Sequence, residues 1–503
     1  MSAGMAAGAR PMPAAPTRQW MENRWSAASR TRAERGAGRR VIVGTATVVA
    51  AAAAIGIALW TPMVVVASLV VVSSAYVALR SRLDAASLLS VVVLAAFLVP
   101  SRYIVGPLGA LGTPSVIAGL AAALWWALAR IGSVDGLATG AQPVRTALVC
   151  LGAAMLAAYA AGWVRPIVAL EGRNADRTAI LWLAYGGVAL LAADGIGSRD
   201  RLETLLRRLV WGATAMGTVA LVQWFGGFDP AAVLAPPGLV DNQVGELTID
   251  LFRRGTFVRV AGTALHPIEF AVTAAATVPL AVALAVADRH RSALSRWTPV
   301  VVLGCSLPLA ISRAGFLGLA AGGALVLAAL DPVRRVAIAA LGAVSAVAMS
   351  FAVPGLAGTI RDWFWAIATD SSITARTSDY RYVDLYVDER PLVGRGFGTF
   401  EPSLYDFLDN QYLLSLIESG VIGLSALVLT LVVGIGCAES ARRRLDGRAA
   451  LIARGVTAGV VVHLVAFATY DDLVFPLAGI QLFALLGAAG AIWRLAPAET
   501  PAR

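Results

Sequence analysis

The chain has 503 residues, of which 58% are hydrophobic and only 14% are charged. Soluble globular proteins carry about a quarter charged residues, so this composition excludes an ordinary soluble domain and indicates a helical membrane protein. The formal net charge of +10 comes entirely from arginine, and the scatter of these arginines over short segments between apolar runs argues against nucleic-acid binding.

Residues 1–40 are rich in Ala, Arg, Pro and Ser and are predicted to form a disordered, basic cytoplasmic tail. The apolar run that follows has no clear small-residue cleavage site, which favours a first transmembrane helix over a signal peptide. Runs long enough to cross about 30 Å of hydrocarbon continue through 41–353 and again through 411–497. We place the spans at 41–60, 62–79, 86–100, 114–129, 146–163, 178–195, 209–226, 267–287, 298–312, 314–330, 336–353, 411–436, 449–468 and 474–493. The sequence therefore predicts an all-α, polytopic integral membrane protein of about 12 to 14 transmembrane helices.

Arginine sets the predicted orientation, because cytoplasmic loops carry an excess of basic residues. With the N-terminus inside, the spans assign 28 arginines to the cytoplasmic side and 13 to the other, which together are the 41 of the chain. Both termini are then cytoplasmic. Two long segments, 227–266 and 354–410, fall on the extracytoplasmic side, and we expect the second to contain short helices. Their content of Trp, Phe, Tyr and Val argues against disorder.

The arginines predicted outside are the unusual feature of this topology. Arg254 and Arg259 lie in the first long segment. Arg313 stands alone between two apolar spans, where it either snorkels to the lipid head groups or meets an anion in a cavity. Arg381 lies in a predicted helix over 374–390, and a solvated salt bridge with a nearby aspartate and a role in a site are equal alternatives there.

A few polar residues lie in or beside the spans. Glu269 falls in the first turn after His266-Pro267, and Glu418 lies eight residues after Asn410, or about 12 Å along a helix. These four polar residues are predicted to line a cavity that opens outward. His463 is interpreted as a structural hydrogen-bonding group in mid-span.

Two further motifs have structural interpretations. The glycines of "GRGFG" (394–398) are expected to let the chain turn at the membrane surface, because a nucleotide-binding loop needs a preceding strand and a cytoplasmic location. Their backbone N–H groups remain available in this interpretation to hold an oxyanion. Asp471-Asp472 is interpreted as an isolated pair in an interfacial loop, so no metal site and no cofactor are expected.

Outward arginines above a polar cleft suit an anionic lipid head group, because planar guanidinium groups match phosphate oxygens with two hydrogen bonds each. A transferase outside the cell has no ATP and needs an activated lipid, such as a polyprenyl-pyrophosphate-linked sugar. The departing pyrophosphate requires charge stabilisation, which arginines can supply. A sugar acceptor also needs a general base, for which Asp409 is the candidate. The equal alternative is that Asp409 is simply a helix cap.

Three stretches share their order and spacing with a known family: "RVAGTALHP" (259–267), "LAISRAGFLGLAAGGALVLAAL" (309–330) and "RPLVGRGFGTFEP…DNQYLLSLIESGVIGL" (390–424). Over roughly residues 200–435 the chain resembles the O-antigen ligase/polymerase superfamily of GT-C-like membrane glycan transferases. The resemblance implies inverting, metal-independent transfer of a glycan from undecaprenyl pyrophosphate on the outer leaflet of the bacterial inner membrane. Pyrophosphate-binding arginines would be Arg259 and Arg313, with Arg254 and Arg381 assisting. The ligase branch has a histidine where this chain has Asp409, which favours a polymerase or another polysaccharide transferase.

The sequence thus predicts a glycosyltransferase whose partners are a polyprenyl-pyrophosphate-linked donor, a glycan or lipid-linked acceptor and membrane lipids, together with other polysaccharide assembly proteins. Two alternatives stay open. One is a transporter of lipid-linked glycan or small anions, although no internal repeat is visible between the two halves. The other is a non-catalytic membrane subunit that keeps the fold and tolerates the loss of Asp409.

Overall fold

The structure, a computed structural model, describes residues 84–131, 137–233, 236–242, 253–254, 257–288, 290–353, 355–356, 358, 361, 383–405 and 407–497. The predicted tail, the first two predicted spans and Arg381 lie outside the described residues. Arg254 is described only by its backbone.

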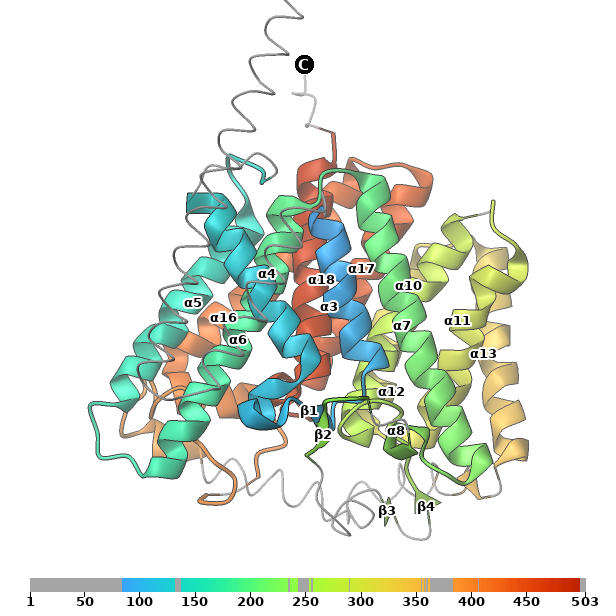
Figure 1. The fold of residues 1–503 in the computed structure, drawn as a ribbon. Coiled ribbons are helices and arrows are strands. Elements are labelled where there is room, and N and C mark those ends of the chain that lie inside the picture. Colours follow the sequence, from blue (N-terminus) through green and yellow to red (C-terminus); the bar gives the residue numbers. More distant parts are fainter. Residues whose placement is uncertain are drawn as a thin grey trace, which may run out of the picture.

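Helices dominate the described part of the chain (Figure 1). In chain order they are α3 (Ala85–Leu98), the 3-10 helix η1 (Gly106–Gly112), α4 (Pro114–Ile131), α5 (Pro143–Gly162), α6 (Ala169–Gly195), α7 (Arg199–Gly226), α8 (Pro230–Val233), α10 (Pro267–Ala287), α11 (Ala293–Ser306), η2 (Leu307–Ala310), α12 (Arg313–Ala328), α13 (Pro332–Ala352), α16 (Gln411–Arg443), α17 (Gly447–Ala466), η4 (Asp472–Val474) and α18 (Pro476–Leu495).

Ten of the described helical segments are long and apolar enough to cross a membrane, and α3 and α12 are shorter apolar helices. Every predicted span from 86–100 onward coincides with a helix in the same order, so the prediction of an all-α polytopic membrane protein is confirmed. The helices α6 and α7 begin about nine residues before their predicted spans. For α7 the cause is local, because the Ser198 side chain caps Arg201 N and starts the helix in polar sequence.

Burial separates a central layer from the periphery. Within the 18-residue apolar stretch of each helix, 94% is buried in α18 and 83% in α10, whereas only 6% is buried in α13. Figure 1 accordingly shows α18 at the centre and α13 at one side. The apolar residues of α13 that face outward are what a lipid-facing helix requires.

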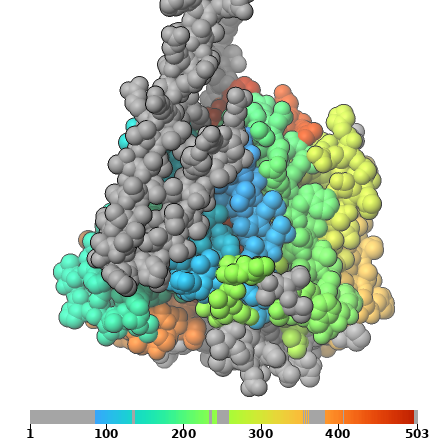
Figure 2. Space-filling view, viewed as in Figure 1, coloured from blue at the N-terminus to red at the C-terminus, as the bar shows by residue number. Residues whose placement is uncertain are grey.

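The lower end of the bundle in Figure 1, which we call the loop-rich end, carries two antiparallel strand pairs. Strand β1 (Tyr103–Ile104) pairs with β2 (Val240–Asp241), and β3 (Arg253–Arg254) pairs with β4 (Phe257–Val258). Residues 229–233 and 236–242 are tied down here because Arg102 forms ion pairs with Asp229 (3.3 Å) and Asp241. Figure 2 shows these residues packed against the lower end of α3. The strands were not predicted, since two-residue strands leave no pattern in the sequence.

The opposite end gathers the arginine-rich segments. Arg207 on α7 forms an ion pair with Asp288 after α10 (2.7 Å), and Arg448 on α17 forms one with Glu203 on α7. Three of the segments that their arginines assign to the cytoplasmic side, 198–208, 288–296 and 439–448, therefore meet at one end of the bundle.

A sharp break in α16 is covered by a passing segment. Gly420 has φ 63° and ψ −170°, which interrupts the helix. Residues 390–400, called the strap here, supply the missing partners: Arg395 N donates to Ile417 O (2.8 Å), Gly396 N donates to Glu418 O (3.0 Å), and the strap accepts hydrogen bonds from Val421 N and Ile422 N. A break of this kind is stable only when another segment satisfies the exposed backbone groups.

The strap needs its glycines for close approach. Gly394, Gly396 and Gly398 all have positive φ, and an added Cβ would lie 2.5–2.8 Å from α16, α5 and α6 respectively. The expectation that these glycines turn the chain is thus met, but their neighbouring amides bind the protein itself rather than a free oxyanion.

Candidate active site

The connection between α17 and α18, residues 467–475, is where the polar ends of several helices meet. Gln411, the first residue of α16, donates from its backbone N to Phe467 O (2.8 Å) and accepts at Oε1 from Leu473 N (2.9 Å). On another side, Glu269 accepts at Oε1 from Leu477 N (3.1 Å). This connection therefore holds the N-terminus of α16, and the start of α18 that follows it holds the N-terminus of α10.

Glu269 and His266 organise the start of α10. The Glu269 carboxylate is fully buried and also accepts from Leu265 N (2.7 Å), while His266 Nδ1 accepts from Ile268 N (3.2 Å) and caps the helix. The His266 ring lies 6.1 Å from that of Phe475, between centroids. Glu269 is not among the residues that line the cavity described below, and its contacts make it a link between two helix ends.

Asp409 and Asn410 precede α16, at the same junction. Asn410 is the helix cap: its Oδ1 accepts from Tyr412 N and Leu413 N, and its Nδ2 donates to Ala468 O (3.2 Å). Asp409 is exposed. Because Asn410 performs the capping, the carboxylate of Asp409 is not required for it.

Arg259 and Arg313 come from neighbouring segments of the loop-rich end. Val260 N donates to Leu309 O (3.4 Å), which places the chain after β4 beside η2, and Arg313 follows η2 as the first residue of α12. Both side chains are buried, at 6% and 9% exposure. Arginine is seldom buried to this degree unless its charge is matched, so these two positions mark a place built around charge.

Helix packing places Arg313 beside the end of α17 that leads into residues 467–475. A Cβ added at Gly315 would touch Ala271 on α10, and one added at Gly318 would touch Val462 on α17. Because α12 and α17 run in opposite directions, Arg313 lies level with the last turn of α17. The same turn precedes the residues that hold Asn410 and Gln411.

A cavity of about 200 Å³ opens beside this junction. Its walls come from α6, the strap, the first turns of α16 and the 471–474 segment. Among the residues that line it are Arg177, Trp182, Glu401, Gln411, Glu418 and Asp471. Of the sequence-predicted residues whose side chains the structure describes, only Glu418 is in the lining, where its Oε1 accepts from Phe400 N (3.0 Å) and so holds the strap.

Asp471 and Asp472 have separate roles that the sequence did not reveal. Asp471 lines the cavity, and burial together with the nearby charge of Asp409 raises its pKa well above the ordinary value. Asp472 is fully buried and bonds through Oδ2 to Nδ1 of His463 (2.6 Å). His463 makes a structural hydrogen bond as expected, but the interfacial-loop interpretation missed that its partner is Asp472.

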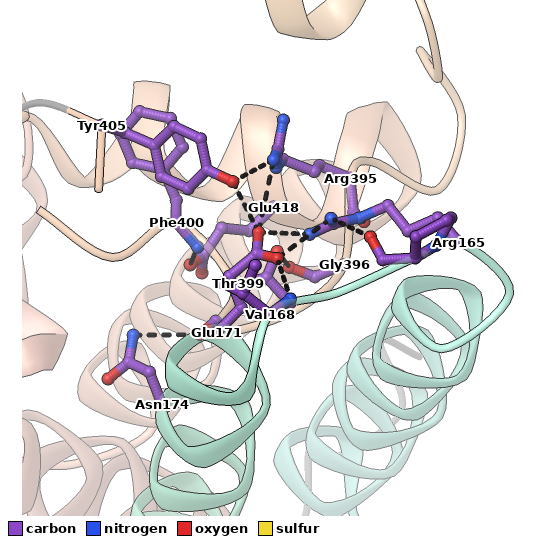
Figure 3. Close-up of polar contacts among 12 residues, drawn as sticks. Arg165, Val168, Glu171, Asn174, Arg395, Gly396, Thr399, Phe400, Tyr405 and Glu418 are labelled. Carbon is purple, nitrogen blue, oxygen red and sulfur yellow. Dashed lines mark hydrogen bonds and ion pairs between the residues drawn. The ribbon is translucent and has the colours of Figure 1, made fainter.

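Behind the strap, one carboxylate gathers four other residues (Figure 3). Glu171 on α6 accepts from Arg165 (2.7 and 3.2 Å), from Arg395 Nη2 (3.2 Å), from the Tyr405 hydroxyl (2.6 Å) and from Val168 N (3.0 Å). We call this the Glu171 network. It fixes the strap to α6, and so fixes one wall of the cavity.

The comparisons with known proteins agree with this part of the chain. Residues 298–428 match the O-antigen ligase family, from α11 to the middle of α16, and carry a domain of that family. The matched segment contains Arg313, Asp409 and Glu418, and it confirms there the resemblance seen in the sequence. A comparison with curated proteins found no match to this chain.

Proposed function

We propose that this protein is a membrane glycosyltransferase that moves a glycan from a polyprenyl-pyrophosphate carrier to a sugar hydroxyl, as an O-antigen or exopolysaccharide polymerase or ligase. The observation that carries the proposal is that the loop-rich end of the bundle carries two buried arginines, Arg259 and Arg313, and the exposed carboxylate of Asp409. The last two lie within the O-antigen ligase family domain. Cations for a leaving diphosphate and a carboxylate for an acceptor are what such a transfer needs.

In the proposed step, the acceptor hydroxyl oxygen attacks the anomeric carbon of the donor sugar. The bond from that carbon to the pyrophosphate oxygen breaks, and its electron pair leaves with the diphosphate, whose growing charge Arg259 and Arg313 stabilise. The hydroxyl proton passes to the Asp409 carboxylate. Attack on the face opposite the leaving group inverts the anomeric configuration. Arg254 and Arg381 are proposed to assist in binding the donor.

Asp409 is proposed as the base and not as a helix cap, because Asn410 already makes the capping contacts. His266 and Glu269 are assigned to shaping the start of α10 beside the donor site. Glu418 is assigned to the wall of the cavity. The loop-rich end is proposed to face outward from a bacterial inner membrane, since the arginine-rich segments gather at the other end.

The proposal is tested with purified protein in nanodiscs supplied with lipid-linked oligosaccharide. The expected result is a longer glycan or a glycoconjugate together with released polyprenyl pyrophosphate, equally with and without a chelator. Arg313→Ala and Asp409→Asn should each abolish product while the protein is still made and inserted. Movement of the lipid-linked glycan across liposome membranes without a new bond would instead identify a transporter, and neither activity would identify a non-catalytic subunit.

A further inference from the structure

The lining of the cavity differs in charge from the region of Arg259 and Arg313. Its ionisable lining consists of three carboxyl groups, those of Glu401, Glu418 and Asp471, and one guanidinium, that of Arg177. Such a lining offers a single cation and cannot match the charge of a diphosphate, whereas Arg259 and Arg313 suit it. The two regions therefore separate by chemistry into one for a polyanion and one for an uncharged polar group.

The rest of the cavity wall is of the kind that binds sugars. Trp182, Phe397 and Phe400 line it with aromatic surface, and Trp182 and Phe397 are held edge to face with centroids 5.0 Å apart. Polar groups stand among these rings. Asn174 on α6 is oriented by its Nδ2, which donates to Gly398 O (2.9 Å; Figure 3). Aromatic surface beside a few fixed polar groups is typical of sites for small polar ligands.

The volume of the cavity and its place beside Asp409 limit the class of ligand further. At about 200 Å³ the cavity is smaller than the roughly 300–1,000 Å³ of drug-sized sites, so it suits one sugar ring rather than an oligosaccharide. Leu408 and Gln411, which flank the Asp409-Asn410 pair, both line the cavity, as does Asp471. A sugar held there lies next to Asp409.

We propose that this cavity binds the terminal sugar of the acceptor glycan, with Arg177 and Glu401 as the residues that recognise its hydroxyl groups. The inference rests on the proposed transferase function and adds to it the place and the chemistry of acceptor recognition. Glu418 holds the strap as one wall, and the Glu171 network holds the strap in turn. The acceptor sugar then lies beside the N-terminus of α16, next to Asp409.

The experiment measures binding by saturation-transfer NMR with the full-length protein in nanodiscs. The probes are the methyl glycosides of glucose, galactose, mannose and N-acetylglucosamine, with binding of inorganic pyrophosphate measured separately. Glu401→Gln and Arg177→Gln should weaken glycoside binding by about tenfold, the loss of one hydrogen bond to a charged group. Both should leave pyrophosphate binding unchanged, which also shows that the variants are folded. The matched controls are Glu389→Gln and Arg173→Gln, whose side chains are exposed and outside the cavity lining.

The two proposals fail separately in this experiment. If no glycoside binds the wild-type protein, or if both cavity variants bind glycosides as well as their controls, the acceptor site is wrong. Arg313→Gln is expected to lose pyrophosphate binding and to keep glycoside binding. If it keeps both, the donor assignment in the proposed function is wrong, while the acceptor cavity stands on its own result.

Discussion

Two tyrosines with the same hydrogen bond in different surroundings offer a direct test of what holds the strap. The Tyr405 hydroxyl donates to Glu171 at 2.6 Å, and the Tyr159 hydroxyl donates to Asp176 at the same distance. The Glu171 carboxylate is 2% exposed, whereas the Tyr159 bond lies on the exposed surface. Removing each hydroxyl therefore compares a group that donates to Glu171 and accepts from Arg395 inside the Glu171 network with one whose hydrogen bond water replaces.

The magnitude follows from burial. In Tyr405→Phe the ring keeps its stacking on Phe400, with centroids 5.0 Å apart, so the change removes only the hydroxyl. A hydrogen bond to a charged group contributes about 1.5–3 kcal/mol, and partial exposure of Tyr405 reduces the expected loss to about 1–2 kcal/mol. Tyr159→Phe should cost less than about 0.5 kcal/mol.

Hydrogen exchange of the strap amides is the appropriate assay, because the network secures a local segment rather than the whole bundle. The amides of Arg395 and Gly396, bonded to α16, should exchange about 5–30 times faster in Tyr405→Phe and at the wild-type rate in Tyr159→Phe. Equal exchange in the two variants would refute the claim that the Glu171 network holds the strap.

The same contact has a defined pH dependence. Burial and the hydrogen bond to Glu171 raise the pKa of Tyr405 above its ordinary value of about 10. The folded protein thus holds this proton more tightly than the unfolded chain, so the contribution is complete below pH of about 10 and is lost as pH rises through the raised pKa. The difference in thermal midpoint between wild type and Tyr405→Phe should stay constant up to that pH and shrink above it. A difference that grows with alkaline pH would contradict this assignment.

Three further outcomes are expected. Arg313→Lys should keep the charge but lose most of the transfer rate, because an ammonium group cannot make two parallel bonds to a phosphate; full activity would argue against a bidentate contact. Asp471→Asn should raise the thermal midpoint while it lowers transfer, because above the ordinary aspartate pKa the fold must keep this carboxyl protonated, at a cost in stability that an amide does not carry; a lower midpoint would show that the carboxyl stabilises the fold. Gly420→Ala should destabilise the protein by at least about 1–3 kcal/mol in thermal unfolding, because φ is positive and the new Cβ would lie 2.4 Å from Leu392 C. The control Gly436→Ala lies on the same helix, where a new Cβ meets nothing within 4 Å, and it should be neutral or slightly stabilising.

The helices were predictable because a membrane-spanning helix needs a long apolar run, which is visible directly in the sequence. Every predicted span that falls within the described residues became a helix. The prediction was poorer at helix starts such as α6, where polar residues extend a helix beyond its apolar part. Local sequence predicts the apolar span of a helix but not how far the helix continues into polar residues.

The site was only partly accessible to sequence reasoning. Asp409 and Asn410 precede an evident helix, so their place at its start was predictable, but the division of roles between cap and carboxylate required the contacts of Asn410. The role of Glu171 depends on Arg395 and Tyr405, which lie far away in the chain, and that of Asp472 depends on His463 in the preceding helix. Nothing in the neighbouring residues reports such contacts, and only the packed fold brings them together.

Direct binding of a short-chain polyprenyl pyrophosphate tests the central claim that Arg259 and Arg313 hold the departing diphosphate. Farnesyl pyrophosphate and farnesyl monophosphate are titrated against the wild-type protein and against Arg259→Gln and Arg313→Gln. We predict that the wild type prefers the diphosphate and that each substitution weakens its binding by about 10–100-fold, the loss of charged hydrogen bonds. Equal affinity of all three proteins for the diphosphate, or no preference over the monophosphate, would contradict the account.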